Sequence, residues 1–82
     1  MRKRYEVRNM DHGEYEVTDL DGNWPSLDGP RPILSVVLNV PAPQINGFRF
    51  LDRWTLVCSV APPMSQYQMD ALNEKLTLEA QL

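Results

Sequence analysis

The chain has 82 residues, a formal net charge of −3 and a share of hydrophobic side chains that is ordinary for a globular protein. This length suffices for one small domain with a thin core, and the negative charge argues against a general binder of nucleic acid or of anionic membranes. The single cysteine, Cys58, cannot form an internal disulfide, and no apolar run approaches the roughly 18 residues that a membrane span needs. We therefore expect a single domain over residues 1–82, in the reducing cytoplasm and without a membrane partner.

The first predicted element is a β-hairpin with arms at residues 4–9 and 14–20. Apolar residues alternate with polar ones in each arm, which is the pattern of strands with one buried face. The link between the arms predicts a type I turn that ends in Gly13 with a left-handed backbone. In this register the apolar sets share one face, and Arg8 lies opposite Glu16 on the other face as an oppositely charged pair.

Acidic residues dominate the stretch after Arg8, because no lysine or arginine follows before Arg31. Glu14 and Glu16 lie on the outer face of their strand, about 6.8 Å apart. That spacing is close to the ~7 Å of two phosphate repeats in DNA, so an acidic ribbon here could occupy a basic groove meant for nucleic acid. The alternative is a solvated hairpin face that Arg8 partly neutralises. The candidate partner-binding acids are Asp11, Glu14, Glu16, Asp19 and Asp21.

Residues 21–32 are predicted to be a loop, because glycine, proline, aspartate and asparagine are frequent in them. Asp21-Gly22 indicates a tight turn, and Asn23-Trp24 a very short return strand. We expect Trp24 to lie over one end of the core, since its side chain is large and apolar. Residues 19–23 resemble a calcium loop superficially, but they lack the later acidic residue of an EF-hand, so no metal site is predicted.

Two further apolar segments are predicted to complete an antiparallel sheet. Residues 33–40 are apolar except for Ser35 and Asn39, which is typical of a central strand covered on both faces. Residues 48–60 alternate with period two and are interrupted by Asp52, so a bulge or bend is expected there. The predicted buried face of this second strand consists of Phe48, Phe50, Trp54, Leu56, Cys58 and Val60.

A C-terminal helix is predicted from about residue 66 nearly to Leu82. Ser65 and Gln68 form a capping box, in which each side chain bonds the other residue's backbone N–H. Met64 before the cap and Met69 in the first turn form a hydrophobic staple. These are the most specific local signals in the chain.

The helix carries two apolar rows on different faces. We expect the first row to pack on the sheet with Trp54 and Leu56; it contains Tyr67, Ala71, Leu78 and Leu82. The second row would form a partner seam or a homodimer contact; its candidate residues are Met69, Leu72 and Leu76. Two alternatives stay open: the rows could be exchanged, or both could belong to one wide face in the groove of a twisted sheet.

Catalytic chemistry has little support in the sequence. A catalytic centre needs a base, a nucleophile or a metal, and a pocket to hold them. The chain offers one histidine, His12, at the hairpin tip, and one cysteine, Cys58, on the predicted buried face. One histidine and one cysteine also fall short of a zinc-ligand set. We therefore predict a protein that is not an enzyme and that has no metal, cofactor or catalytic residue.

These features predict an α+β fold. Residues 1–61 would form an antiparallel sheet of about four strands, and residues 62–82 would supply one C-terminal helix packed on it. A small, partly closed β-barrel capped by the helix is the alternative.

The predicted function is that of a small acidic protein-binding module. It would be an inhibitor or adaptor that docks on a larger protein with a basic surface, such as a complex that handles nucleic acid; phage anti-defence proteins offer an analogy from size and charge alone. One alternative is a structural subunit that self-assembles through its C-terminal helix. The other is a nucleic-acid binder that uses the basic N-terminus, and it is less favoured because these basic residues lack interleaved aromatic residues for base stacking.

Overall fold

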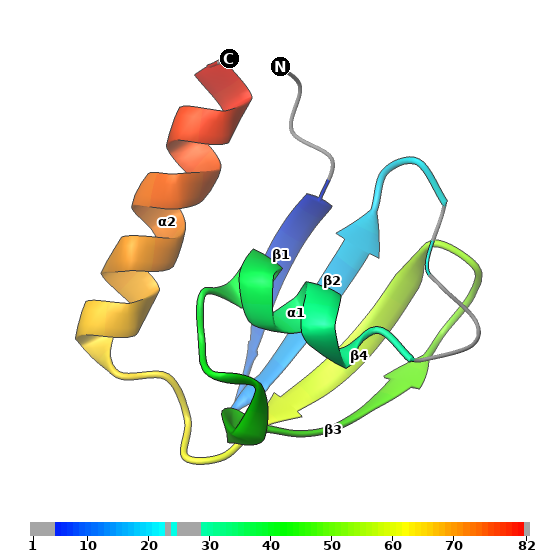
Figure 1. Ribbon diagram of the computed structural model, residues 1–82, viewed down its shortest axis with the longest axis horizontal. Helices are drawn as coiled ribbons and strands as arrows, with labels where there is room; N and C mark the ends of the chain where they lie inside the picture. Colours follow the sequence, from blue (N-terminus) through cyan, green and yellow to red (C-terminus); the bar gives the residue numbers. More distant parts are fainter. Residues whose placement is uncertain (1–4, 23, 25–28, 82) are drawn as a thin grey trace.

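The computed structural model describes residues 5–22, 24 and 29–81, without the side chains of residues 79–81. Its elements in chain order are β1 (Tyr5–Asp11), β2 (Glu14–Asp19), α1 (Arg31–Leu38), the 3-10 helix η1 (Ala42–Gln44), β3 (Ile45–Phe50), β4 (Thr55–Val60) and α2 (Gln66–Gln81). The strands form one antiparallel sheet in the order β1-β2-β4-β3 (Figure 1). The α+β class is confirmed, and the sheet does not close into the barrel that was the alternative.

Both helices pack on the same face of the sheet. Tyr15 and Val17 of β2 lie opposite Cys58 and Leu56 of β4, and all four side chains are buried. Residues of the two helices join them in a single core cluster, namely Leu34, Val37 and Leu38 of α1 and Leu72 of α2. No described helix covers the opposite face, which we term the open face.

The first hairpin has the predicted register. Arg8 lies opposite Glu16, and its Nη2 is 3.1 Å from Glu16 Oε2. The turn differs from the prediction, because His12 and Gly13 both have positive φ, at 57° and 78°. Positive φ at both central positions is the mark of a type I′ turn, whose twist matches that of the flanking strands. The irregularity lies in β1 instead, where the pairing register shifts between Asn9 and Asp11.

The prediction of a strand at residues 33–40 is wrong, since α1 occupies most of this segment. Leu34, Val37 and Leu38 are buried while Val36 is exposed, and this spacing is helical. Asn39 ends the helix in the left-handed conformation, and its N–H donates to the Val36 carbonyl at 3.3 Å. A short apolar run does not distinguish a buried strand from a helix by periodicity, which explains the error.

The predicted long strand at residues 48–60 is a second hairpin. The chain reverses at residues 51–54, and β3 and β4 pair with each other on either side. Asp52 stabilises the reversal, because its Oδ1 accepts hydrogen bonds of 2.8 Å from the N–H groups of Trp54 and Thr55. A bend was expected at Asp52, but β3 rather than residues 33–40 supplies the fourth strand of the sheet.

The predicted capping box of α2 is present. Gln68 Oε1 accepts from Ser65 N at 2.9 Å, and Ser65 Oγ accepts from Gln68 N at 3.1 Å. Gln68 also bonds Gln44 of η1 through its side-chain amide, at 3.0 Å. Farther along, Lys75 Nζ donates to the Val36 carbonyl near the end of α1. The start of α2 is therefore tied to η1, and its middle to α1.

The orientation expected for α2 is reversed. Leu72 is 1% exposed and Met69 and Leu76 pack against the core, whereas Tyr67 of the other row is 82% exposed. The physical reason is the staple: Met64 is buried in the core cluster, and the helix must then turn the row of Met69 inward. Leu72 is therefore a core residue rather than part of a partner seam.

Candidate functional site

The histidine and the cysteine considered for catalysis lie in different environments. His12 is exposed in the β1–β2 turn, while Cys58 is buried with its Sγ 3.6 Å from the Tyr15 carbonyl oxygen. Burial raises the pKa of the Cys58 thiol to about 11, so it is protonated at neutral pH. No group of three or more His, Cys, Asp or Glu side chains in the described ranges is arranged to hold a metal ion.

The acidic candidates do not share one surface. Glu14 and Glu16 alternate with the buried residues of β2 and so lie on the open face, as predicted, and Glu16 pairs there with Arg8. Asp19 lies on the covered face and is fully buried. Its Oδ1 accepts from Asp21 N at 2.9 Å, so it organises the turn after β2. Asp19 is therefore not accessible to a partner.

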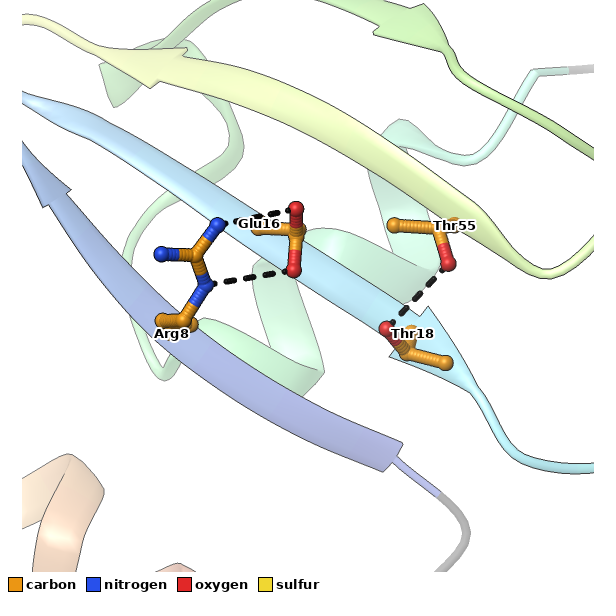
Figure 2. A network of polar contacts seen from close by, with 4 residues as sticks. All are labelled: Arg8, Glu16, Thr18 and Thr55. Atoms are coloured by element: carbon orange, nitrogen blue, oxygen red, sulfur yellow. Dashed lines mark hydrogen bonds and ion pairs between the residues drawn. The ribbon is translucent and has the colours of Figure 1, made fainter.

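The open face has mixed charge. Arg8, Glu16, Val57 and Arg49 follow one another in register across β1, β2, β4 and β3. Beside this row the hydroxyls of Thr18 and Thr55 lie 3.3 Å apart (Figure 2). The flanking arginines reduce the negative potential of this face, which is weaker than the run of acids in the sequence indicated.

A second surface gathers large side chains at the end of the sheet where β3 and β4 are joined. These side chains are exposed to solvent or only half-buried, and they come from β3, the β3–β4 loop, the segment before α1 and the start of α1. We term this the aromatic–arginine surface; it consists of Trp24, Phe48, Phe50, Leu51, Trp54, Arg31 and Arg53.

Ring contacts hold the aromatic–arginine surface in place. Trp24 lies between Tyr5 and Phe50, with ring centroids 5.5 and 6.4 Å away, and Phe50 meets Phe48 edge to face at 6.0 Å. The indole Nε1 of Trp24 also donates to the Trp54 carbonyl at 2.7 Å. These contacts preorganise side chains that nonetheless remain accessible.

Gly22 allows the indole of Trp54 to lie against the backbone. A Cβ at this position would be 2.4 Å from Trp54 Nε1, so the indole would have to move to admit any side chain. Gly22 also has a φ of 69°, in the left-handed region that glycine adopts without strain. The turn after β2 is therefore shaped to receive a side chain from the second hairpin.

Two guanidinium groups lie over rings of the aromatic–arginine surface. Arg31 Cζ is 5.7 Å from the centroid of Phe48, and Arg53 Cζ is 5.2 Å from that of Trp54. Such cation–π contacts are worth about 0.5–1 kcal/mol at exposed sites. The acid beside them, Asp52, uses Oδ1 to cap its own loop. The surface therefore presents two guanidinium groups on a chain whose net charge is −3.

The period-two pattern of residues 48–60 did not predict this surface, because it placed Phe48, Phe50 and Trp54 on a buried face. The available signal was the alternation of aromatic and arginine residues from Phe48 to Trp54, beside an Asp suited to capping a loop. The basic N-terminal residues 2–4, named in one alternative, lie outside the described residues. So do Asn23 of the expected return strand and Leu82 of the first helical row.

The chain matches no protein-family model, no curated protein and no solved structure. Among the described helices, none is long and apolar enough to cross a membrane.

Proposed function

We propose that this protein is a small, non-enzymatic protein-binding module, an inhibitor or adaptor that docks on a larger protein through its aromatic–arginine surface. The supporting observation is a cluster of Phe, Trp and Leu side chains that are ordered yet exposed, with arginines among them. Aromatic residues and arginine are enriched in protein interfaces, and Trp and Arg are frequent hot spots. Contiguous exposed apolar surface of this kind commonly marks an interaction site.

Energetics favour a role in binding over a role in the core. Full burial of a Phe or Leu side chain contributes about 1.5–3 kcal/mol, and a domain of this size has little core from which to draw stability. Leaving Phe50, Leu51 and Trp54 about half exposed forgoes part of that gain. A partner that covers them would recover it. Because ring contacts already order the side chains, little further conformational entropy would be lost on binding.

The acidic part of the open face offers a second contact. Glu14 and Glu16 lie there and could meet a basic surface of the partner, such as that of a complex that handles nucleic acid. The ion pair with Arg8 limits this contribution. We therefore assign the main docking energy to the aromatic–arginine surface, and orientation of the partner to the acids.

A matched pair of leucines tests the proposal. Leu51 in the β3–β4 loop and Leu78 on α2 are exposed to nearly the same extent, 50% and 54%. We would capture binding proteins from a lysate of the source organism with the wild type, Leu51→Ser and Leu78→Ser, and then reconstitute each complex from purified components. Leu51→Ser should weaken a genuine complex roughly tenfold, as loss of a hot-spot contact does, while Leu78→Ser should leave it unchanged.

The opposite result supports a different function. Tyr67 and Leu78 form the exposed row of α2, and this observation favours the alternative of a structural subunit that self-assembles through its helix. If sedimentation shows a wild-type dimer that Leu78→Ser dissociates and Leu51→Ser preserves, self-assembly replaces docking as the function.

A further inference from the structure

We infer that the partner presents an acidic segment to the aromatic–arginine surface, with carboxylates flanking apolar side chains. This inference rests on the docking function proposed above and adds the chemistry of the partner. It depends on the charge of the surface, on the geometry of its guanidinium groups, and on the arrangement of its rings.

The guanidinium groups of the aromatic–arginine surface favour carboxylates as binding partners. Arg31 and Arg53 contribute two positive charges, and Asp52 one negative charge that two backbone N–H groups of its own loop already bond. Asp19 and Asp21 belong to the turn beside Trp54, but the Asp19 carboxylate is buried and accepts a hydrogen bond from Asp21 N. Salt screens interactions between charges farther apart than about 8 Å at physiological ionic strength. A carboxylate that approaches the Phe48 and Trp54 rings from solvent therefore meets the exposed guanidinium groups of Arg31 and Arg53.

The guanidinium geometry suits a carboxylate that approaches from solvent. Each group is held over a ring, at 5.7 Å for Arg31 and 5.2 Å for Arg53, and neither forms an ion pair with a residue in the described part of the chain. A guanidinium that stacks on a ring can still bind a carboxylate through the N–H groups of its edge. An acidic segment can thus bind both arginines without displacing them, while its apolar side chains cover Phe50 and Leu51.

The ring arrangement disfavours single-stranded nucleic acid as the ligand. Base stacking needs accessible ring faces, but Arg31 and Arg53 lie over the faces of Phe48 and Trp54. Phe50 meets both Trp24 and Phe48 edge to face, so these rings do not present parallel faces to successive bases. The same surface therefore fits an acidic protein segment better than a nucleic acid.

The protein carries its own probe for this test. Its two tryptophans, Trp24 and Trp54, both belong to the aromatic–arginine surface, so a ligand that docks there changes their fluorescence. We would select binders from a displayed library of random twelve-residue peptides and titrate the enriched peptides against the full chain. A twelve-nucleotide oligothymidylate would be titrated alongside.

Two variants distinguish the effect of the arginines on the aromatic–arginine surface from that of an arginine on the open face. The double variant Arg31→Gln/Arg53→Gln removes both stacked guanidinium groups. Arg49→Gln is the matched control, because Arg49 belongs to the same hairpin but lies on the open face opposite Val57. We expect acidic, apolar peptides to be enriched, the double variant to weaken them at least tenfold, and the control to change their affinity less than twofold.

The inference is overturned by enrichment of basic or uncharged peptides, by equal binding of the peptides to the double variant and the control, or by tighter binding of the oligothymidylate than of any peptide. A selection that enriches no peptide also overturns the inference that the partner presents an acidic linear segment. The docking function then stands only if the reconstituted complex still depends on Leu51. If that dependence is lost as well, both proposals fail together.

Discussion

The β1–β2 and β3–β4 hairpins lie side by side in one sheet, joined by the pairing of β2 with β4. Their reversals are at opposite ends, because Glu14 beside the first turn pairs with Ser59, whereas Thr18 pairs with Thr55 beside the second loop. The first hairpin closes in a tight turn of the exposed His12 and the buried Gly13, and the second in a longer loop that displays Leu51 and Trp54. The two hairpins thus have different roles: the first contributes to the sheet and core, and the second also carries residues of the surface that we propose for docking.

The largest expected difference is between one buried and one exposed apolar residue. Val17 of the first hairpin is fully buried and Phe50 of the second is about half exposed. Val17→Asp should unfold the domain, because a buried unpaired carboxylate costs several kcal/mol in a protein with roughly 5 kcal/mol to lose. Phe50→Asp should remain folded and lose only binding. Circular dichroism melts of both variants check this, and unfolding of both would erase the distinction between the hairpins.

The contact between the two hairpins should weaken in alkali. Cys58 of β4 is buried against the Tyr15 carbonyl of β2, and burial raises the pKa of its thiol from 9.0 to about 11. A raised pKa means that the folded state favours the protonated thiol, so this stability is complete below pH 9 and is lost as the pH rises towards 11. The loss is on the order of 2–3 kcal/mol at most. Urea titrations at pH 7, 9 and 10.5 should show it.

The matched variant for this effect is Cys58→Ala. It should lose about 1 kcal/mol at neutral pH through a small cavity and lack the thiol's part of the alkaline decline. If the stability of Cys58→Ala falls by the same amount at high pH, groups other than the thiol account for the whole decrease.

An effect of similar size should follow from Gly22→Ala. The new Cβ would meet the Trp54 indole at 2.4 Å in a left-handed backbone, so the indole must move and stability should fall by about 1–3 kcal/mol. Gly47→Ala is the control, since nothing lies within 4 Å of a Cβ at that position. Tryptophan emission should shift in Gly22→Ala alone. An unshifted spectrum would show that the turn does not shape the aromatic–arginine surface.

The smallest expected effect is at Arg8. The ion pair with Glu16 raises the pKa of Arg8 through a hydrogen bond and through charge attraction, but the pair is exposed to solvent. Arg8→Gln should lower the melting temperature only slightly at low salt, and not at all in 1 M salt, where screening removes the attraction. A large decrease that persists in high salt would mean that the first hairpin depends on this pair after all.

Features that depend on a specific local pattern of residues were predicted correctly from the sequence. The hairpin register followed from two matching faces, and the capping box from the spacing of Ser65 and Gln68. The error at α1 came from an apolar run that periodicity alone leaves ambiguous, although prolines before it and Asn39 after it are helix boundary signals. The reversed rows of α2 could have been resolved by the staple, since the burial of Met64 turns Met69 inward.

The aromatic–arginine surface needed the structure, because its members come from segments distant in the sequence. The period-two pattern correctly placed Phe48 and Phe50 on the same side of β3 as the core, but the pattern does not say how far a covering helix extends. α1 has only eight residues, or about 12 Å of length, and both phenylalanines remain exposed. The extent of cover is a tertiary property, and it decides here which apolar residues face solvent.

The attachment of α2 has a consequence for hydrogen exchange. Its first turn is held by the capping box and by Gln44, and its middle by Leu72, whereas Thr77 and Leu78 are exposed. Amide protection should therefore fall from the start of the helix towards its end, and the last turns should exchange without opening of the sheet. The hydroxyl of Tyr15 donates to Met69 Sδ at 3.6 Å, so the environment of this ring would report the rarer event in which the whole helix detaches.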